Sequence, residues 1–370
     1  MERRGQPDYQ LLGLTLVLLI FGLLVLTSAS SIIALHIFND SYYFVKHQIF
    51  FGLIPGILVG YFFYKIPTAQ WQNNAVFIMG VSLTILVAVL IPGVGETYDK
   101  NARSWINLFG FSFQPAEFVK LGLILFFSAY LLKHKEHLAN WQQGFFPALI
   151  VGLLPVGLLM LQPDVGTASI IFTLVVALLF FAGARLKHIT ALLVLGIIGF
   201  ASMVAIAPYR LDRLTTFLHP ELDPLGVGYQ INQAYLAIGS GGIFGLGLGH
   251  SRQKFQYLPE VHADSIFAIL AEEGGFMVTL IFIFILYFWL RRLFILAKNT
   301  SNDYDRLLVS GIAAWIMSQS FLNIGAIIGL LPLTGVPLPL VSHGGTSLLT
   351  TLAALGIVAR VSQSANWRTK

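Results

Sequence analysis

The chain has 370 residues, of which 56% are hydrophobic and only 11% are charged, and its mean hydropathy is +0.78. These values exclude an ordinary soluble globular protein and predict an integral membrane protein that crosses the bilayer several times. The net charge of +5 is weak evidence for a nucleic-acid partner, because Lys and Arg gather on the cytoplasmic side of membrane proteins. The sequence has no cysteine, which excludes disulfides and thiolate chemistry.

Ten apolar segments follow one another along the chain, each close to the roughly 20 residues that a spanning helix needs. They cover residues 11–29, 48–64, 75–92, 115–132, 144–161, 166–183, 189–207, 264–290, 306–330 and 345–362. The sequence therefore predicts ten transmembrane helices in one all-α membrane domain over residues 1–370. The first segment runs into "TSASS", which is typical of a signal peptide, but the further spans favour an uncleaved anchor.

Both ends of the chain are predicted to be cytoplasmic. Most of the 22 Lys and Arg residues then fall on the inner side, including those of "ERR", "KHK", "ARLK" and "RTK". On this topology two substantial loops lie outside, over residues 93–114 and 208–263. The second loop is far longer than ordinary connections and is rich in aromatic residues and glycine, which favours a functional segment over a free linker.

Carboxylates gather in the stretch "YLPEVHADSIFAILAEEGG", where an apolar span begins. Charge inside a membrane is costly, so such residues are functional candidates by default. Asp264 faces the outer loop, and its two alternatives are a functional carboxylate and a helix N-cap. Glu272 and Glu273 lie two turns deeper on other faces of the helix. We expect them to form buried hydrogen bonds with another span.

Two further polar clusters are predicted on the outer side. In "QPAEFVK", Glu117 and Lys120 are three residues apart and share a helix face. They form either a surface ion pair or, with Arg103 of "NARSWINLFG", an anion-facing site. In "QPDVGT", Asp164 lies in the turn between two spans, where a turn or cap aspartate is the simpler interpretation.

The glycine-rich stretch "GSGGIFGLGLGHS" matches neither G-x-G-x-x-G nor the P-loop pattern. Two alternatives are open: a glycine nest that offers amides to a diphosphate, and a turn that packs closely on a helix. The "DYD" of residues 303–305 indicates a solvated charge run. The scattered histidines carry no zinc signature.

Five stretches run in order along nearly the whole chain: "QPAEFVK", "QPDVGT", "DPLGVGYQINQAYLAIGSGG", "GLGLGHSRQKFQYLPEVHADSIFAILAEE" and "LPLTGVPLPLVSHGGTS". Together they resemble the SEDS family, the shape, elongation, division and sporulation proteins FtsW, RodA and SpoVE. The stretch "GLGLGHSRQKFQYLPE" is more similar to the FtsW and SpoVE pattern than to RodA. Departures are Ala263 and Ser265 for the family's usual Thr and Phe, and His343 where Tyr or Phe is usual.

The resemblance implies an all-helical fold similar to the glycosyltransferase C enzymes. It also implies a peptidoglycan glycosyltransferase that polymerises lipid II at the outer face of the bacterial cytoplasmic membrane. Its implied ligands are lipid II and the undecaprenyl-diphosphate-linked glycan, and its implied partners are a class B penicillin-binding protein, a transpeptidase, and other division or elongation proteins. The family's essential aspartate falls on Asp264, and the Glu and Lys of its Q-P-[SA]-E-x-x-K motif fall on Glu117 and Lys120.

Inverting transfer of a sugar from a diphosphate needs a base for the attacking hydroxyl and positive charge for the departing diphosphate. It needs no protonated acid, in contrast to glycoside hydrolysis. Asp264 is the candidate base, and Lys120 is a candidate cation. The candidate substrate-binding residues are Arg103, Arg210, Arg213, Gln230, Gln233, Lys254, Glu260, His262, Asp164 and Ser342. A divalent cation, Mg²⁺ or Mn²⁺, is an alternative carrier of the phosphate charge, with Glu117 or Asp164 as its ligand.

Two other classes of function are alternatives. A flippase for lipid-linked cell-wall precursors would also need charges in spans, but it should hold its site near the midplane between repeated halves, whereas the polar residues here gather at the outer face. A noncatalytic division scaffold predicts that the outer carboxylates are dispensable. The scaffold therefore differs from the enzyme in what Asp264→Asn should do, and the flippase differs in where its site should lie.

Overall fold

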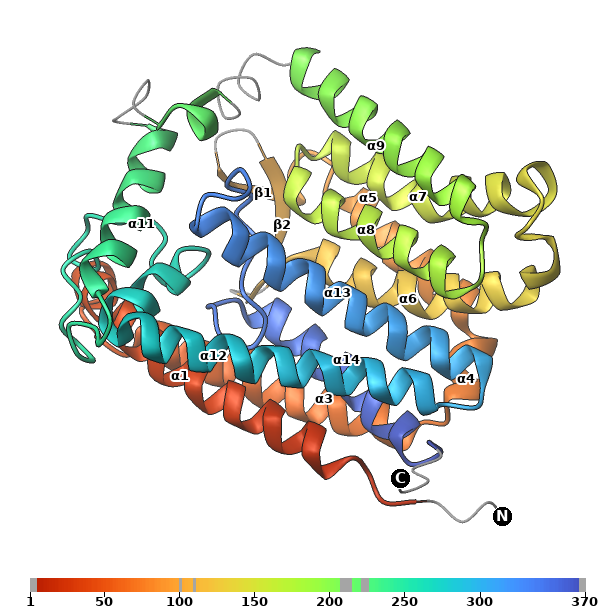
Figure 1. The fold of residues 1–370 in the computed structure, drawn as a ribbon, viewed down its shortest axis with the longest axis horizontal. Coiled ribbons are helices and arrows are strands. Elements are labelled where there is room, and N and C mark those ends of the chain that lie inside the picture. Colours follow the sequence, from red (N-terminus) through yellow and green to blue (C-terminus); the bar gives the residue numbers. More distant parts are fainter. Residues whose placement is uncertain (1–4, 100–101, 109–110, 207–214, 221–225, 366–370) are drawn as a thin grey trace.

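Long helices run side by side in the computed structural model, which describes residues 5–99, 102–108, 111–206, 215–220 and 226–365. The N- and C-terminal ends lie together at one end of the resulting bundle (Figure 1). The predicted all-helical membrane fold is confirmed, with a small sheet added to it.

The long helices are α1 (Tyr9–Phe38), α3 (Ile54–Lys65), α5 (Ala75–Ala88), α6 (Pro115–Lys133), α7 (Phe146–Leu161), α8 (Val165–Phe181), α9 (Leu186–Ile206), α11 (Val227–Gly241), α12 (Ile266–Asn299), α13 (Asp303–Ile327) and α14 (Gly345–Ser362). The shorter ones are α2 (Tyr43–His47), α4 (Thr68–Asn73), the π-helices Gln48–Leu53 and Trp141–Phe145, and the 3-10 helix Lys135–His137. The first π-helix joins α2 to α3, and the second lengthens α7.

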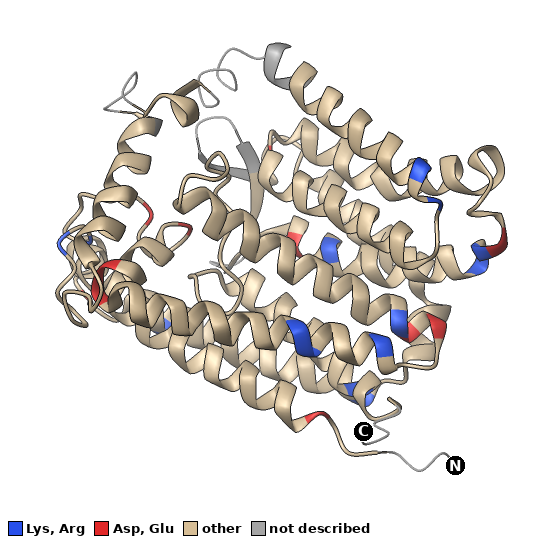
Figure 2. Cartoon of the chain, viewed as in Figure 1, with Lys and Arg blue, Asp and Glu red and all other residues tan. Residues whose placement is uncertain are grey.

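Seven helical segments among the described residues are long and apolar enough to cross a membrane. They are Tyr9–Phe38, Tyr43–Lys65, Pro115–Lys133, Trp141–Leu161, Ile266–Asn299, Asp303–Ile327 and Gly345–Ser362. Three shorter apolar helices, Ala75–Ala88, Val165–Phe181 and Leu186–Ser202, stand at the other three positions where the sequence predicts spans. Lys and Arg gather toward the end of the bundle that holds both termini (Figure 2).

Three helices form the centre of the bundle. In α6, α13 and α14, 72%, 78% and 83% of the apolar window is buried, against 22% in the segment that contains α3. Close approach of α14 to α3 depends on small residues, because a Cβ on Gly356 would lie 2.1 Å from the carbonyl oxygen of Gly60. The central helices therefore carry their polar residues into a protein interior, and α3 mostly faces outward.

The N-terminal helix is fixed at its start by charge and by capping. The Asp8 carboxylate accepts hydrogen bonds from the amides of Gln10 and Leu11, which satisfies orphan donors of α1. Arg292 of α12 pairs with the same carboxylate, with Nε 2.6 Å from Oδ2. The cap thus ties α1 to α12.

The two predicted outer loops both contain regular structure. The first forms a three-stranded antiparallel sheet in the order β1 (Gly95–Asp99), β2 (Ala102–Leu108), β3 (Phe111–Phe113). The second contains α11, which lies at one edge of the bundle and packs against α12 (Figure 1). Both features stand at the end of the molecule away from the termini.

The glycine-rich stretch packs on a break in α12. Gly275 has a φ of +65°, in the left-handed region that favours glycine, and a Cβ there would lie 2.2 Å from the Gly245 amide nitrogen. The amides of Leu246 and Gly247 donate to the carbonyl oxygens of Glu272 and Glu273. Those two amides are therefore engaged by the helix, and of the two alternatives the structure adopts the closely packed turn.

Candidate active site

Asp264 lies in the turn immediately before α12. Its Oδ1 accepts long hydrogen bonds of 3.4 Å from Gln230 Nε2 and Ser265 Oγ. Its backbone carbonyl accepts a 2.8 Å hydrogen bond from Asn323 Nδ2. Side chains from α11 and α13 thus fix this turn, and Ser265 rather than Asp264 is the N-cap of α12. The N-cap alternative for Asp264 is therefore wrong.

The Asp264 carboxyl is a weak acid for an aspartate. Burial raises its pKa to about 7, and the Glu260 carboxylate adds to the rise, while hydrogen bonds from Ser265 and Gln230 oppose it. The residue nevertheless keeps part of its surface exposed. A carboxylate with a pKa near neutral is suited to accept a proton from a substrate hydroxyl.

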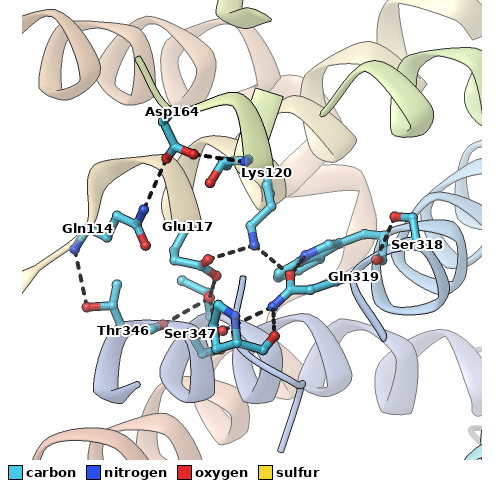
Figure 3. A network of polar contacts seen from close by, with 12 residues as sticks. Gln114, Glu117, Lys120, Asp164, Ser318, Gln319, Thr346 and Ser347 are labelled. Atoms are coloured by element: carbon cyan, nitrogen blue, oxygen red, sulfur yellow. Dashed lines mark hydrogen bonds and ion pairs between the residues drawn. The ribbon is translucent and has the colours of Figure 1, made fainter. Parts of the chain in front are cut away.

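Glu117 and Lys120 form an ion pair inside the bundle. Lys120 Nζ donates at 2.7 Å to Glu117 Oε1 and at 2.7 Å to Gln319 Oε1 (Figure 3). Glu117 Oε2 accepts from Thr350 of α14 at 3.3 Å. The exposed fraction of Lys120 is 0%, so the surface-pair alternative is wrong. A buried pair of this kind leaves an uncompensated charge when one partner is removed.

Asp164 caps α8 and contacts the start of α6. Its Oδ1 accepts from the Thr167 amide at 2.9 Å, and its Oδ2 accepts from Gln114 Nε2 at 3.3 Å (Figure 3). Burial raises the pKa of Asp164, while the hydrogen bonds from Thr167 and the charge of Lys120 oppose the rise. The predicted cap is confirmed, and the second and third polar clusters lie next to each other.

Glu272 and Glu273 are buried, as predicted, but they bind different partners. Glu273 accepts from Ser28 Oγ of α1 at 2.6 Å, and this bond reaches another span. Glu272 accepts from the Ser251 hydroxyl and, at 2.9 Å, from the Arg252 amide. One glutamate therefore joins two spans, and the other holds the loop before Asp264.

Lys254 is the basic partner of Glu273. Its Nζ lies 2.8 Å from Glu273 Oε1 and donates to Ser28 Oγ at 3.2 Å. The Lys254 side chain is 3% exposed. Its charge is therefore compensated by a carboxylate inside the protein.

Comparison with known proteins identifies the chain. Residues 9–367 match the profile of the FtsW/RodA/SpoVE family, described as cell cycle protein. The chain belongs to the FtsW/RodA/SpoVE family. It is 40% identical over 365 residues to stage V sporulation protein E of Bacillus subtilis, with 98% of each chain covered. It is 37% identical to a "probable peptidoglycan glycosyltransferase FtsW" of Trichlorobacter lovleyi, with 97% of this chain and 94% of the relative covered.

Solved structures of the FtsW/RodA/SpoVE fold agree with this assignment. A chain of a peptidoglycan synthase complex superposes with a TM-score of 0.80 at 30% identity, with 98% of this chain and 99% of that chain covered. The rod shape determining protein RodA of Thermus thermophilus gives a TM-score of 0.71 at 29% identity, with 97% and 98% covered. The predicted family and its membrane fold are confirmed.

The remaining candidate residues of this FtsW/RodA/SpoVE chain are spread over several environments. Gln233 is half-buried on α11, one turn beyond Gln230. Ser342 is buried, and its Oγ accepts from the Leu338 amide at 2.8 Å, so it is engaged by its own turn. Arg103 lies on β2, but its side chain is outside what the structure describes. Arg210 and Arg213 lie outside the described residues.

Three histidines, His47, His262 and His343, lie together near the turn that holds Asp264, and the sequence marks only His262 as a candidate. The His262 ring stacks on Phe44 with centroids 4.1 Å apart. His343 shares a 3.2 Å hydrogen bond with His47, and its amide donates to the His262 carbonyl. Burial lowers the pKa of His262 to about 4 and that of His343 to about 3. Burial therefore favours the neutral form of both rings at neutral pH.

The candidate ligands of a divalent cation do not fit that role. Both carboxylate oxygens of Glu117 are engaged, by the Lys120 ammonium and the Thr350 hydroxyl. Both oxygens of Asp164 accept hydrogen bonds from amides. In the described part of the chain, no group of three or more His, Cys, Asp or Glu residues is placed to hold a metal.

Proposed function

We propose that this chain is a peptidoglycan glycosyltransferase that polymerises lipid II into glycan strands. The observation that carries the proposal is a partly exposed aspartate, Asp264, whose pKa of about 7 suits a general base. The FtsW relative of Trichlorobacter lovleyi, a probable peptidoglycan glycosyltransferase that is 37% identical over nearly the whole chain, supports the same reaction class.

In the proposed reaction the sugar hydroxyl of the acceptor gives its proton to an Asp264 carboxylate oxygen. The hydroxyl oxygen forms a bond to the anomeric carbon of the donor, with inversion. The bond from that carbon to the diphosphate oxygen breaks, and the undecaprenyl diphosphate leaves with the electron pair. Because a diphosphate is a stable anion, its departure needs positive charge rather than a proton donor.

The proposed source of that positive charge is three arginines of the two predicted outer loops. We assign Arg103, Arg210 and Arg213 to the diphosphate. Gln230 and Gln233 of α11 are the proposed contacts to the rest of the substrate. Lys120 and Lys254 are less suited to direct contact, because each is buried against a carboxylate. Glu260 and His262 flank the base, and Glu260 is the more exposed of the two, with 60% of its side chain accessible.

We place the site at the outer face of the bacterial cytoplasmic membrane, with both termini in the cytoplasm. Support comes from the Lys and Arg residues near the termini (Figure 2) and from the preference of basic residues for the inner side. A class B penicillin-binding protein is the proposed partner, since a structural relative belongs to a peptidoglycan synthase complex. We propose that the identity of this partner determines whether the enzyme acts in division, elongation or sporulation.

Purified protein supplied with lipid II tests the proposal, with glycan strands separated on a gel. The enzyme should make strands in detergent, where no membrane separates two compartments. A flippase would move labelled lipid II across proteoliposomes and make no strands. A noncatalytic scaffold would do neither, so absence of strands from folded protein would overturn the proposal.

A further inference from the structure

The loop between α13 and α14 depends on side chains for its hydrogen bonds. Its sequence "VPLPL" contains Pro337 and Pro339, which have no amide hydrogen and cannot take part in a regular backbone ladder. Asn323 Nδ2 donates at 2.8 Å to the Val336 carbonyl. Gln319 Nε2 donates at 2.9 Å to the next carbonyl, that of Pro337. Two amides of α13 therefore hold two consecutive peptide groups of this loop.

The same two side chains also contact Asp264 and the Glu117–Lys120 pair. Asn323 Nδ2 makes its second hydrogen bond, of 2.8 Å, to the Asp264 carbonyl. Gln319 Oε1 accepts at 2.7 Å from Lys120 Nζ and at 2.7 Å from Trp315 Nε1 (Figure 3). Gln319 and Asn323 are four residues apart, so they share one face of α13. Their exposed fractions are 0% and 2%, so neither amide exchanges its partners with bulk water.

The Lys120 ammonium is fully committed to this interior. It donates to Glu117 and Gln319 and lies 4.8 Å from the centroid of the Trp315 ring. To touch a diphosphate it would have to leave the Glu117 carboxylate buried without its counter-charge, which is strongly unfavourable. A contribution of Lys120 to the proposed reaction must therefore reach the site through the residues that it contacts.

We propose that Asn323 is a positioning residue for Asp264, and that the Glu117–Lys120 pair acts on Asp264 through Gln319 and Asn323 without touching substrate. The inference rests on the proposed function and adds the route by which the buried pair serves it. The Asn323 hydrogen bond fixes the backbone from which the Asp264 carboxylate projects. A displacement of roughly 1 Å at a reacting group can cost about a hundredfold in rate.

The first test is Asn323→Ala, with Ser320→Ala as a matched control. Ser320 is also buried on α13, and its hydroxyl donates to Ile316 of its own helix. We expect Asn323→Ala to lower kcat for lipid II polymerisation about a hundredfold with KM little changed. The acid limb of its pH profile should move to lower pH, because a loosened turn admits water to the carboxyl of Asp264. The control should match wild type in all three quantities.

A normal kcat in Asn323→Ala would overturn the inference. So would a loss of activity that follows the fraction of unfolded protein, with the pH midpoint of the remaining activity unchanged. Asp264→Asn is measured in parallel. If Asp264→Asn polymerises normally, the proposed function fails first, whereas an inactive Asp264→Asn beside a normal Asn323→Ala contradicts only the positioning role.

The second test is the double variant of Lys120→Met and Asn323→Ala. If both residues act through one series of contacts, the double variant should be no slower than the slower single variant, because either substitution alone already interrupts that series. If Lys120 instead met the diphosphate independently, the two rate losses would multiply. Multiplied losses would contradict the route through Gln319 and Asn323.

Discussion

At the scale of single residues, the neighbours of Asp264 determine its chemistry more than the residue itself does. An ordinary aspartate is fully ionised at neutral pH and is a poor base. Here burial and the Glu260 carboxylate raise the pKa to about 7. Because the proposed mechanism uses the ionised form of Asp264 as the base, activity should rise with pH through the neutral range and reach a plateau above it.

The Glu260→Gln variant tests this dependence. Removing a negative neighbour stabilises the ionised form of Asp264, so its pKa should fall and the acid limb of the kcat profile should shift to lower pH. The exposed Glu260 is screened by solvent, so the shift should be small and should shrink with added salt. Glu136→Gln, an exposed change elsewhere, is the control and should not move the midpoint. A shift to higher pH in Glu260→Gln would contradict the assignment.

At the scale of elements, the break in α12 is held by charge as well as by glycine. Glu273 follows the first turns of α12, and its carboxylate binds Lys254 of the preceding loop and Ser28 of α1. The paired side chains are 3% and 4% exposed. Such a pair contributes little to the net free energy of unfolding, but removing one of its charges leaves the other buried without a partner.

We therefore expect Glu273→Gln to lower stability by about 3–5 kcal/mol, the usual cost of breaking a buried pair. Adding Lys254→Met should recover much of the loss, because no unpaired charge then remains. Thermal unfolding in detergent measures both variants. If the double variant is less stable than Glu273→Gln alone, the pair has a role beyond mutual neutralisation.

The neighbouring Glu272 gives a separate prediction. Glu272→Leu should lower the free energy of unfolding more than Glu272→Gln, because Gln keeps one acceptor oxygen for the loop amides.

At the scale of the whole molecule, the membrane-spanning helices and the segments that connect them have different roles. The helices α6, α13 and α14 carry the polar interior, while α11 and the turn before α12 hold Asp264, the proposed base. Both termini and many basic residues stand at the opposite end (Figure 2). The bundle thus has one basic end and one end that holds the candidate chemistry.

The absence of native cysteine makes this orientation directly measurable. A single cysteine at the exposed His250 should react with a membrane-impermeant thiol reagent in intact spheroplasts. A single cysteine at the exposed Glu136 should react only after the membrane is opened. The reverse labelling pattern would invert the proposed topology and place the site in the cytoplasm.

Much of the fold could be predicted because the hydropathy of a segment depends only on its own residues. Span boundaries depend on runs of apolar residues, and the carboxylates are conspicuous inside such runs. The partners could not be predicted, because Gln319 and Asn323 meet the loop after α13 only once distant segments pack. Their spacing of four in an apolar helix was the available signal. The spacing of Glu117 and Lys120 showed a shared face, but not that this face is buried.

The most direct measurement of the central claim is the rate of lipid II polymerisation by Asp264→Asn. Asn keeps the size and the acceptor oxygen of Asp but cannot take a proton, so the fold and membrane insertion should be unchanged. We expect no glycan strands from this variant in protein whose thermal unfolding matches wild type. Strands made at close to the wild-type rate would contradict the assignment of Asp264 as the general base.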